Sequence, residues 1–138
     1  MNDQLSRRFS RRIRIQPFKY DTADTQKAYD ALLQDAEYAT PFEVPLHIES
    51  PDIAPRIYYA SNGWIGFTSD LIRGAAILGL KSGEKRLSRD LLSQSFEKNI
   101  QEHFKMKQNP FNRRSFMPEQ ACELITIEKK RQEDKQGE

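Results

Sequence analysis

The chain has 138 residues, a mean hydropathy of −0.80 and 37% hydrophobic residues, which limits it to one small domain with tails and a modest core. It has no apolar run near the ~20 residues that a membrane helix needs and no signal-peptide pattern, so we expect a cytoplasmic protein with no membrane partner. The net charge of +2 hides two basic clusters, a net +5 in residues 1–20 and +4 in residues 105–114, which favour phosphate-bearing partners.

The first predicted element is a strand at residues 12–16, where Ile13 and Ile15 alternate with polar residues before Pro17. The next segment with a strand-like pattern is residues 124–127, far along the chain. A strand without a partner leaves its backbone donors and acceptors unpaired. One explanation is that the rest of its sheet belongs to sequence upstream of this chain.

Four helices are predicted after the strand. The first covers residues 24–38, with Thr22 or Asp24 as its cap, and the second begins at Ser50-Pro51. Asn62-Gly63 ends the second, and a third helix covers residues 65–81 with small residues that allow a close neighbour. The fourth begins at Ser88. Asn109-Pro110 and Pro118 break the helical pattern, and from Glu128 the chain is almost wholly charged or polar, so residues 109–138 are predicted to form a flexible tail.

The sequence contains no complete active site. It lacks a GxxxxGK[ST] phosphate loop and an apolar strand that ends in paired acids, so it offers no site for Mg²⁺ beside a nucleotide. Its one cysteine, Cys122, excludes an internal disulfide, and neither His47 nor His103 has ligand-like spacing. We therefore predict no metal site.

Two segments stand out from this background. One is Gln4-Leu5-Ser6-Arg7-Arg8-Phe9, followed by the predicted strand and Pro17-Phe18. The other is residues 56–66, which end in Gly63-Trp64-Ile65-Gly66 and lead into the Ala-rich third helix; Ser82-Gly83 then connects it to the fourth. Together they resemble the end of the core and the helical lid of AAA+ ATPases of the TniB/TnsC type, which regulate DNA transposition. The resemblance covers about residues 2–104 and rests on the order and spacing of these segments.

The resemblance implies a mainly α fold: a lid-like four-helix bundle preceded by one orphan strand and followed by a flexible tail. Residues 1–18 would end the ATPase core, residues 19–108 would form the lid, and residues 109–138 the tail. The chain would be part of an ATP-dependent regulator that assembles on DNA as a ring or filament and directs a transposase. ATP and Mg²⁺ would bind only in the intact protein, and a transposase and a TniQ-like protein would be its partners.

The resemblance also implies roles for individual residues. Arg8, or Arg7 as second choice, would be an arginine finger that reaches the γ-phosphate of ATP in a neighbouring subunit. The alternative is that both are surface residues at the end of a helix. The sensor-2 region, which faces nucleotide in the same subunit, would lie at Gly63, Trp64, Gly66, Asp70 and Arg73. Here the chain departs from the family, because Asp70 stands where a basic residue is usual; either Arg73 substitutes for it or the lid serves mainly in packing. Trp64 is alternatively a hydrophobic plug of the lid core.

The second basic cluster supplies the candidate nucleic-acid-binding residues Lys105, Lys107, Arg113 and Arg114, for which solvated surface charge is the alternative. Two other functions stay open at this point. The chain could be a free-standing helical adaptor that binds DNA or protein through its two basic ends. It could also be the lid of another AAA+ branch, such as a replication-initiator or secretion ATPase.

Overall fold

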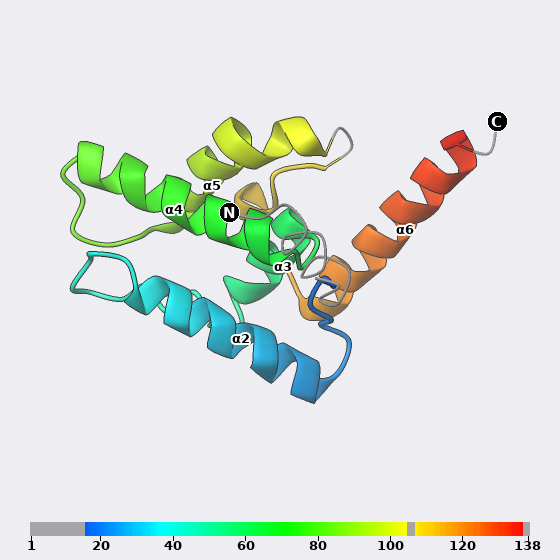
Figure 1. The fold of residues 1–138 in the computed structure, drawn as a ribbon, viewed down its shortest axis with the longest axis horizontal. Coiled ribbons are helices and arrows are strands. Elements are labelled where there is room, and N and C mark those ends of the chain that lie inside the picture. Colours follow the sequence, from blue (N-terminus) through cyan, green and yellow to red (C-terminus); the bar gives the residue numbers. More distant parts are fainter. Residues whose placement is uncertain (1–15, 105–106, 137–138) are drawn as a thin grey trace, which may run out of the picture.

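The structure is a computed structural model that describes residues 16–104 and 107–136 (Figure 1). Within these ranges it is helical and contains no strand. The elements in chain order are α2 (Ala23–Tyr38), α3 (Ala54–Ser61), α4 (Ile65–Lys81), α5 (Arg89–Ser95), the π-helix η1 (Phe96–Ile100), the 3-10 helices η2 (Gln101–His103) and η3 (Pro110–Asn112), and α6 (Pro118–Gln136). The mainly α prediction is confirmed. The predicted strand lies outside the described residues except for Gln16, which is not in a strand.

Local capping explains where several helices begin. Thr22 and Thr25 form a reciprocal capping box at the start of α2, and the Ser88 side chain accepts from the Leu91 N–H at the start of α5, as predicted. The prediction for the second helix is wrong at its start. The Ser50 carbonyl accepts from the N–H groups of residues 53 and 54 in a turn, and Pro55 rather than Pro51 occupies the first turn of α3.

Helix α3 is the centre of the molecule, and all eight of its residues are buried. It packs against α4 on one side and α6 on another, while α4 also packs along α5. Gly74 allows α4 and α5 to approach closely, because a Cβ at this position would lie 2.4 Å from both Ser95 Oγ and Asn99 Nδ2. The Ser95 hydroxyl instead donates to the Leu71 carbonyl at 2.8 Å. The predicted use of small residues for close approach is confirmed at this position.

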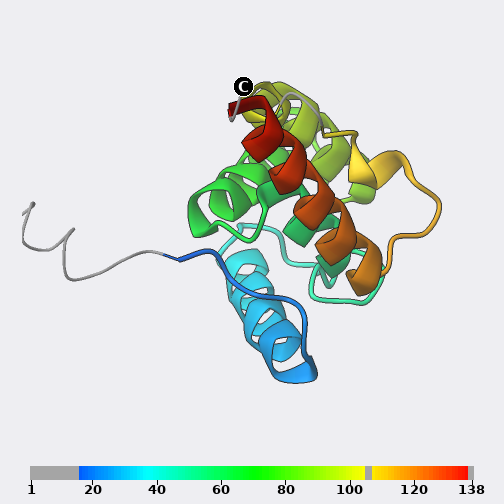
Figure 2. The same cartoon turned by 90° about the vertical axis from the view of Figure 1, so that its right-hand side faces the viewer.

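The segment expected to be a flexible tail requires a correction. Its described part forms η3 and α6, and the residues expected as a possible strand, 124–127, lie inside α6. Phe111 and Phe116 are buried, and Ala121 and Ile125 bury one side of α6, four residues apart. The helix therefore forms because its first half covers α3. Figure 2 shows α6 crossing in front of the other helices, and Figure 1 shows its C-terminal half leaving the body of the molecule.

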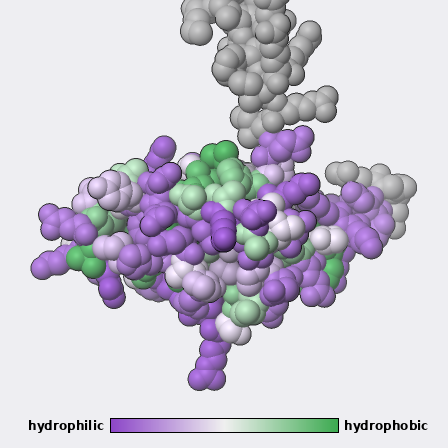
Figure 3. Space-filling view, turned by 90° about the horizontal axis from the view of Figure 1, so that it is seen from below, coloured by the Kyte–Doolittle hydropathy of each residue, from purple (hydrophilic) through white to green (hydrophobic). Residues whose placement is uncertain are grey.

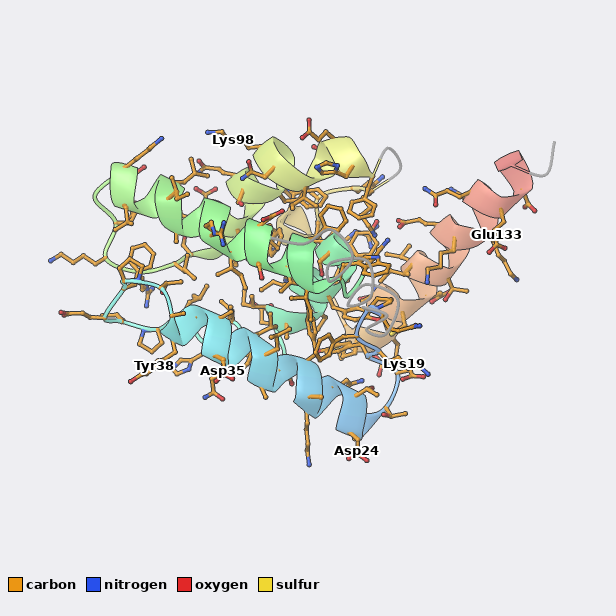
Figure 4. The ribbon with its side chains drawn as sticks, viewed as in Figure 1. Lys19, Asp24, Asp35, Tyr38, Lys98 and Glu133 are labelled. Carbon is orange, nitrogen blue, oxygen red and sulfur yellow. The ribbon has the colours of Figure 1, made fainter. Side chains whose placement is uncertain are left out.

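The outer side of α2 faces solvent. Asp24, Asp35 and Tyr38 point away from the other helices (Figure 4), and the Tyr38 side chain is 92% exposed. The view from below, onto this side, is mostly hydrophilic with small separate hydrophobic patches (Figure 3). None of the helices within the two described ranges combines the length and apolar character needed to cross a membrane.

Candidate functional site

The turn between α3 and α4 contains two of the predicted nucleotide-site residues, Gly63 and Trp64. Asn62 and Gly63 adopt left-handed backbone conformations, with φ of 53° and 77°, and Trp64 is the N-cap of α4 in an extended conformation. Gly63 is needed for two reasons. Its positive φ is strained for other residues, and a Cβ there would lie 2.5 Å from the Phe18 carbonyl oxygen.

The chain just after the predicted strand is fixed to this turn. The Phe18 N–H donates to the Gly63 carbonyl at 2.9 Å, and the Tyr58 hydroxyl donates to the Phe18 carbonyl at 2.7 Å. The Phe18 ring also contacts the Tyr29 ring, with centroids 5.7 Å apart. We call these two hydrogen bonds the Phe18 clamp. They join the end of residues 1–18 to the α3–α4 turn through Gly63 and to α3 through Tyr58.

The remaining predicted sensor-2 residues lie along the exposed side of α4. Trp64 is 38% exposed, so it is not the buried plug of a core. Gly66, Asp70 and Arg73 are also exposed, the last two at successive positions of this face. Arg73 lines a cavity of about 440 Å³ between α4 and the end of α2, together with small and aliphatic side chains that include Ala36 and Ile77. Gly66, Asp70 and Arg73 therefore share one exposed face of α4, with Arg73 at its α2 side, whereas Gly63 is buried in the turn.

Beneath this face lies a buried hydroxyl network that the sequence analysis missed. The Tyr29 hydroxyl lies 3.2 Å from Ser61 Oγ and 2.8 Å from Thr68 Oγ1, and the two smaller hydroxyls are 2.9 Å apart. Burial raises the pKa of Tyr29, so the network is neutral. It links α2, α3 and α4. Each residue occupies an inward position of its helix, but no sequence spacing indicates that the three hydroxyls meet.

The second basic cluster does not form a single surface. Lys105 lies outside the described residues. The Lys107 side chain is 1% exposed, its Nζ lies 2.9 Å from Glu128 Oε2, and it sits 3.7 Å above the centre of the Tyr59 ring. Burial lowers the pKa of Lys107 to about 8, against the opposing effect of Glu128. Lys107 is thus unable to contact nucleic acid in this structure, whereas Arg114 is exposed and Arg113 half-buried.

The proposed arginine finger cannot be placed, because Arg7 and Arg8 lie outside the described residues. Within the described part of the chain, no group of three or more His, Cys, Asp or Glu side chains could hold a metal ion.

Comparison of the chain with protein-family models, with curated proteins and with solved structures finds no significant match. Any function has therefore to be inferred from the residues and geometry of the chain itself.

Proposed function

We propose that this chain is the lid region of an ATP-dependent regulator of DNA transposition, of the TniB/TnsC type, together with the last segment of its AAA+ core. In such a protein, residues 1–18 end the core and supply Arg8, with Arg7 second, to ATP in a neighbouring subunit. The α3–α4 turn and the exposed face of α4 lie toward nucleotide in the same subunit. ATP and Mg²⁺ bind in the core of the intact protein.

The Phe18 clamp is the observation that carries the proposal. A lid can respond to nucleotide only if its position is coupled to the core, and the clamp ties the chain leaving residues 1–18 to the turn that begins α4. The Tyr58 hydroxyl is directed to this bond by its ring, which stacks on Tyr20 with centroids 4.8 Å apart. Movement of the core segment would therefore be transmitted to Trp64 and Gly66 without an intervening flexible linker.

Asp70 stands where the TniB/TnsC family usually has a basic residue, and this difference bears on the role of the lid. A carboxylate at an exposed position of α4 repels phosphate, and Arg73 lines the cavity next to α2 rather than the start of α4. The proposal therefore gives this lid a mechanical role in assembly, with the charge on ATP stabilised mainly by Arg8 across the subunit interface.

The first test is the coding sequence upstream of Met1. It should encode, in frame, a Walker A loop and a strand that ends in acids, whereas an unrelated gene would contradict the proposal. The 138-residue chain alone should hydrolyse no ATP, and turnover by the pure chain would refute the assignment.

The second test uses the intact regulator and measures ATP-dependent assembly on DNA. Tyr58→Phe removes one bond of the clamp and keeps the ring, so we expect assembly to fall several-fold while the fold is kept, at a cost of about 1 kcal/mol in stability. Tyr38→Phe is the matched control, because Tyr38 is 92% exposed and should have no effect. Arg8→Ala should abolish assembly and leave the monomer folded. Normal assembly of both Tyr58→Phe and Arg8→Ala would exclude coupling through this segment.

The competing function is a free-standing helical adaptor. One observation favours it: the described residues close a core of their own without any sheet. The burial of Lys107 counts against it, because one of the two basic ends loses a charge that the adaptor would use. DNA or protein binding by the chain with no ATPase gene upstream would favour the adaptor.

A further inference from the structure

Two arginines from different helices hold the backbone of residues 109–116, which we call the basic loop. The fully buried Arg56 of α3 donates through Nη1 to the Pro110 carbonyl at 2.7 Å and to the Arg113 carbonyl, and through Nη2 to the Arg114 carbonyl at 3.2 Å. Arg89, at the start of α5, donates through Nε to the Phe111 carbonyl at 2.7 Å and through Nη2 to the Arg113 carbonyl. Four loop carbonyls are thereby turned inward.

The two guanidiniums bring more positive charge to the loop than the surrounding acids neutralise. Among the described residues, Asp52 is the one carboxylate within ion-pair distance of either arginine, at 3.2 Å from Arg56 Nη2, and its side chain is 61% exposed. Burial and the nearby Arg89 lower the pKa of Arg56, which reflects the cost of holding this charge inside. The loop itself adds Arg113 and Arg114 and no acid, and the Glu97 carboxylate contacts it only at the other end, where Asn109 Nδ2 donates to Glu97 Oε1 at 3.1 Å.

The outward side of the loop presents donors. Arg114 and Ser115 are exposed, and the Arg113 guanidinium lies over the Phe116 ring, 5.7 Å from its centroid. Within the described residues, the backbone N–H groups of Arg114 and Ser115 have no hydrogen-bond acceptor. Neither of the two cavities described between residues 34 and 80 includes a residue of the loop. Because Arg114 and Ser115 are exposed and the loop carbonyls are held by Arg56 and Arg89, the outer side of the loop is a cationic surface with a fixed backbone.

We propose that the basic loop is a docking surface for the phosphodiester backbone of duplex DNA. Phosphate contacts of this kind come from arginine side chains and free backbone N–H groups. Single-stranded nucleic acid would in addition need exposed aromatic rings for base stacking, and both phenylalanines of the loop are buried. The inference rests on the DNA-binding part of the proposed function and extends it to a defined site, but it needs no ATPase core.

Direct binding of the 138-residue chain to DNA tests the site. The probe is a fluorescein-labelled duplex of about 25 base pairs, titrated without ATP by fluorescence anisotropy at several salt concentrations between about 50 and 200 mM. Arg113→Gln/Arg114→Gln should weaken binding about tenfold at the lowest salt and reduce the slope of log K against log salt by about two. Lys129→Gln/Lys130→Gln removes the same charge from the exposed part of α6 and should change the affinity less than about threefold.

A third variant tests whether the loop is held in place for binding. Arg89→Lys keeps the charge but loses the planar fork that spans two carbonyls, so we expect weaker binding by about fivefold with an unchanged helical circular-dichroism spectrum. Inorganic phosphate at the same total phosphate concentration should not displace the duplex.

Three results would overturn the site: equal loss in the two double variants, no measurable binding of the unchanged chain at low salt, or displacement by inorganic phosphate. Each is independent of ATP. A failure here therefore differs from a failure of ATP-dependent assembly in the Tyr58→Phe experiment.

Discussion

At the scale of single residues, burial changes the chemistry of Lys107. Its ammonium group lies between Glu128 and the face of the Tyr59 ring, and the Tyr59 hydroxyl donates to the other oxygen of Glu128 at 2.5 Å. This cluster joins the segment before η3 to α3 and α6. Charge counting in the sequence assigned Lys107 to a surface, because nothing in its neighbours indicates that Glu128, 21 residues later, lies beside it.

The Lys107 cluster predicts a pH dependence of stability. The pKa of Lys107 is about 8 in the folded chain and about 10.5 when unfolded. Between these values the unfolded state binds more protons, so raising the pH stabilises the fold. We expect the free energy of unfolding, measured with urea, to rise by about 2 kcal/mol from pH 8 to pH 10 relative to Lys107→Met. The same pH profile for both proteins would contradict the assignment.

At the scale of elements, helices with capping residues and periodic apolar positions were predictable. The bounds of α4 and the starts of α2 and α5 follow from Thr22, Ser88 and the Asn62-Gly63 stop. The start of α3 and the whole of α6 could not be predicted from capping residues and periodicity. Both are decided by tertiary packing: α3 is buried on every side, and α6 gains its order from Ala121 and Ile125, although residues 124–127 favour a strand locally. The Phe18 clamp could not be predicted either, since its two hydrogen bonds join residues 40 and 45 apart in the sequence.

The α3–α4 turn yields a matched pair of glycine substitutions. Gly63→Ala places a Cβ 2.5 Å from the Phe18 carbonyl at a φ of 77°, and should destabilise the chain by more than about 2 kcal/mol. Gly66→Ala meets no atom within 4 Å and should stabilise α4 by about 0.5 kcal/mol. Thermal unfolding of both variants measures the difference. Similar melting temperatures would mean that the turn is not held against residue 18.

At the scale of the whole molecule, α3 is a hub on which both ends of the described chain meet. Tyr20 stacks on Tyr58 near the start, while Cys122 Sγ donates to the Tyr20 carbonyl at 3.6 Å from α6. Residues about 100 apart in sequence thus share one core, and the predicted division into a lid and a separate tail does not describe this packing.

Truncation from the C-terminus tests this view. Removing residues 131–138 deletes the last part of α6, whose residues 131–134 are exposed, and should change the urea midpoint little. Removing residues 118–138 deletes Glu128, which pairs with Lys107 and accepts from the Tyr59 hydroxyl, together with the buried Ala121 and Ile125, and should cost at least about 3 kcal/mol. Equal stability of the two truncated proteins would show that α6 is not part of the cooperative unit.

The π-helix η1 has a consequence for everything that follows it. A single π turn contains one residue more than an α turn, and each residue of an α-helix turns the chain by about 100°. The extra residue between Phe96 and Ile100 therefore acts as a phase shift in the helix. Leu92, Phe96 and Ile100 are all buried and lie four residues apart, a spacing that drifts around an α-helix by about 40° per step. The slower winding of the π turn from Phe96 to Ile100 offsets this drift, and beyond it Phe104 reaches Phe67 with ring centroids 5.0 Å apart. The change in winding is thus confined to a single turn, and the apolar residues on both sides of it pack against the same core.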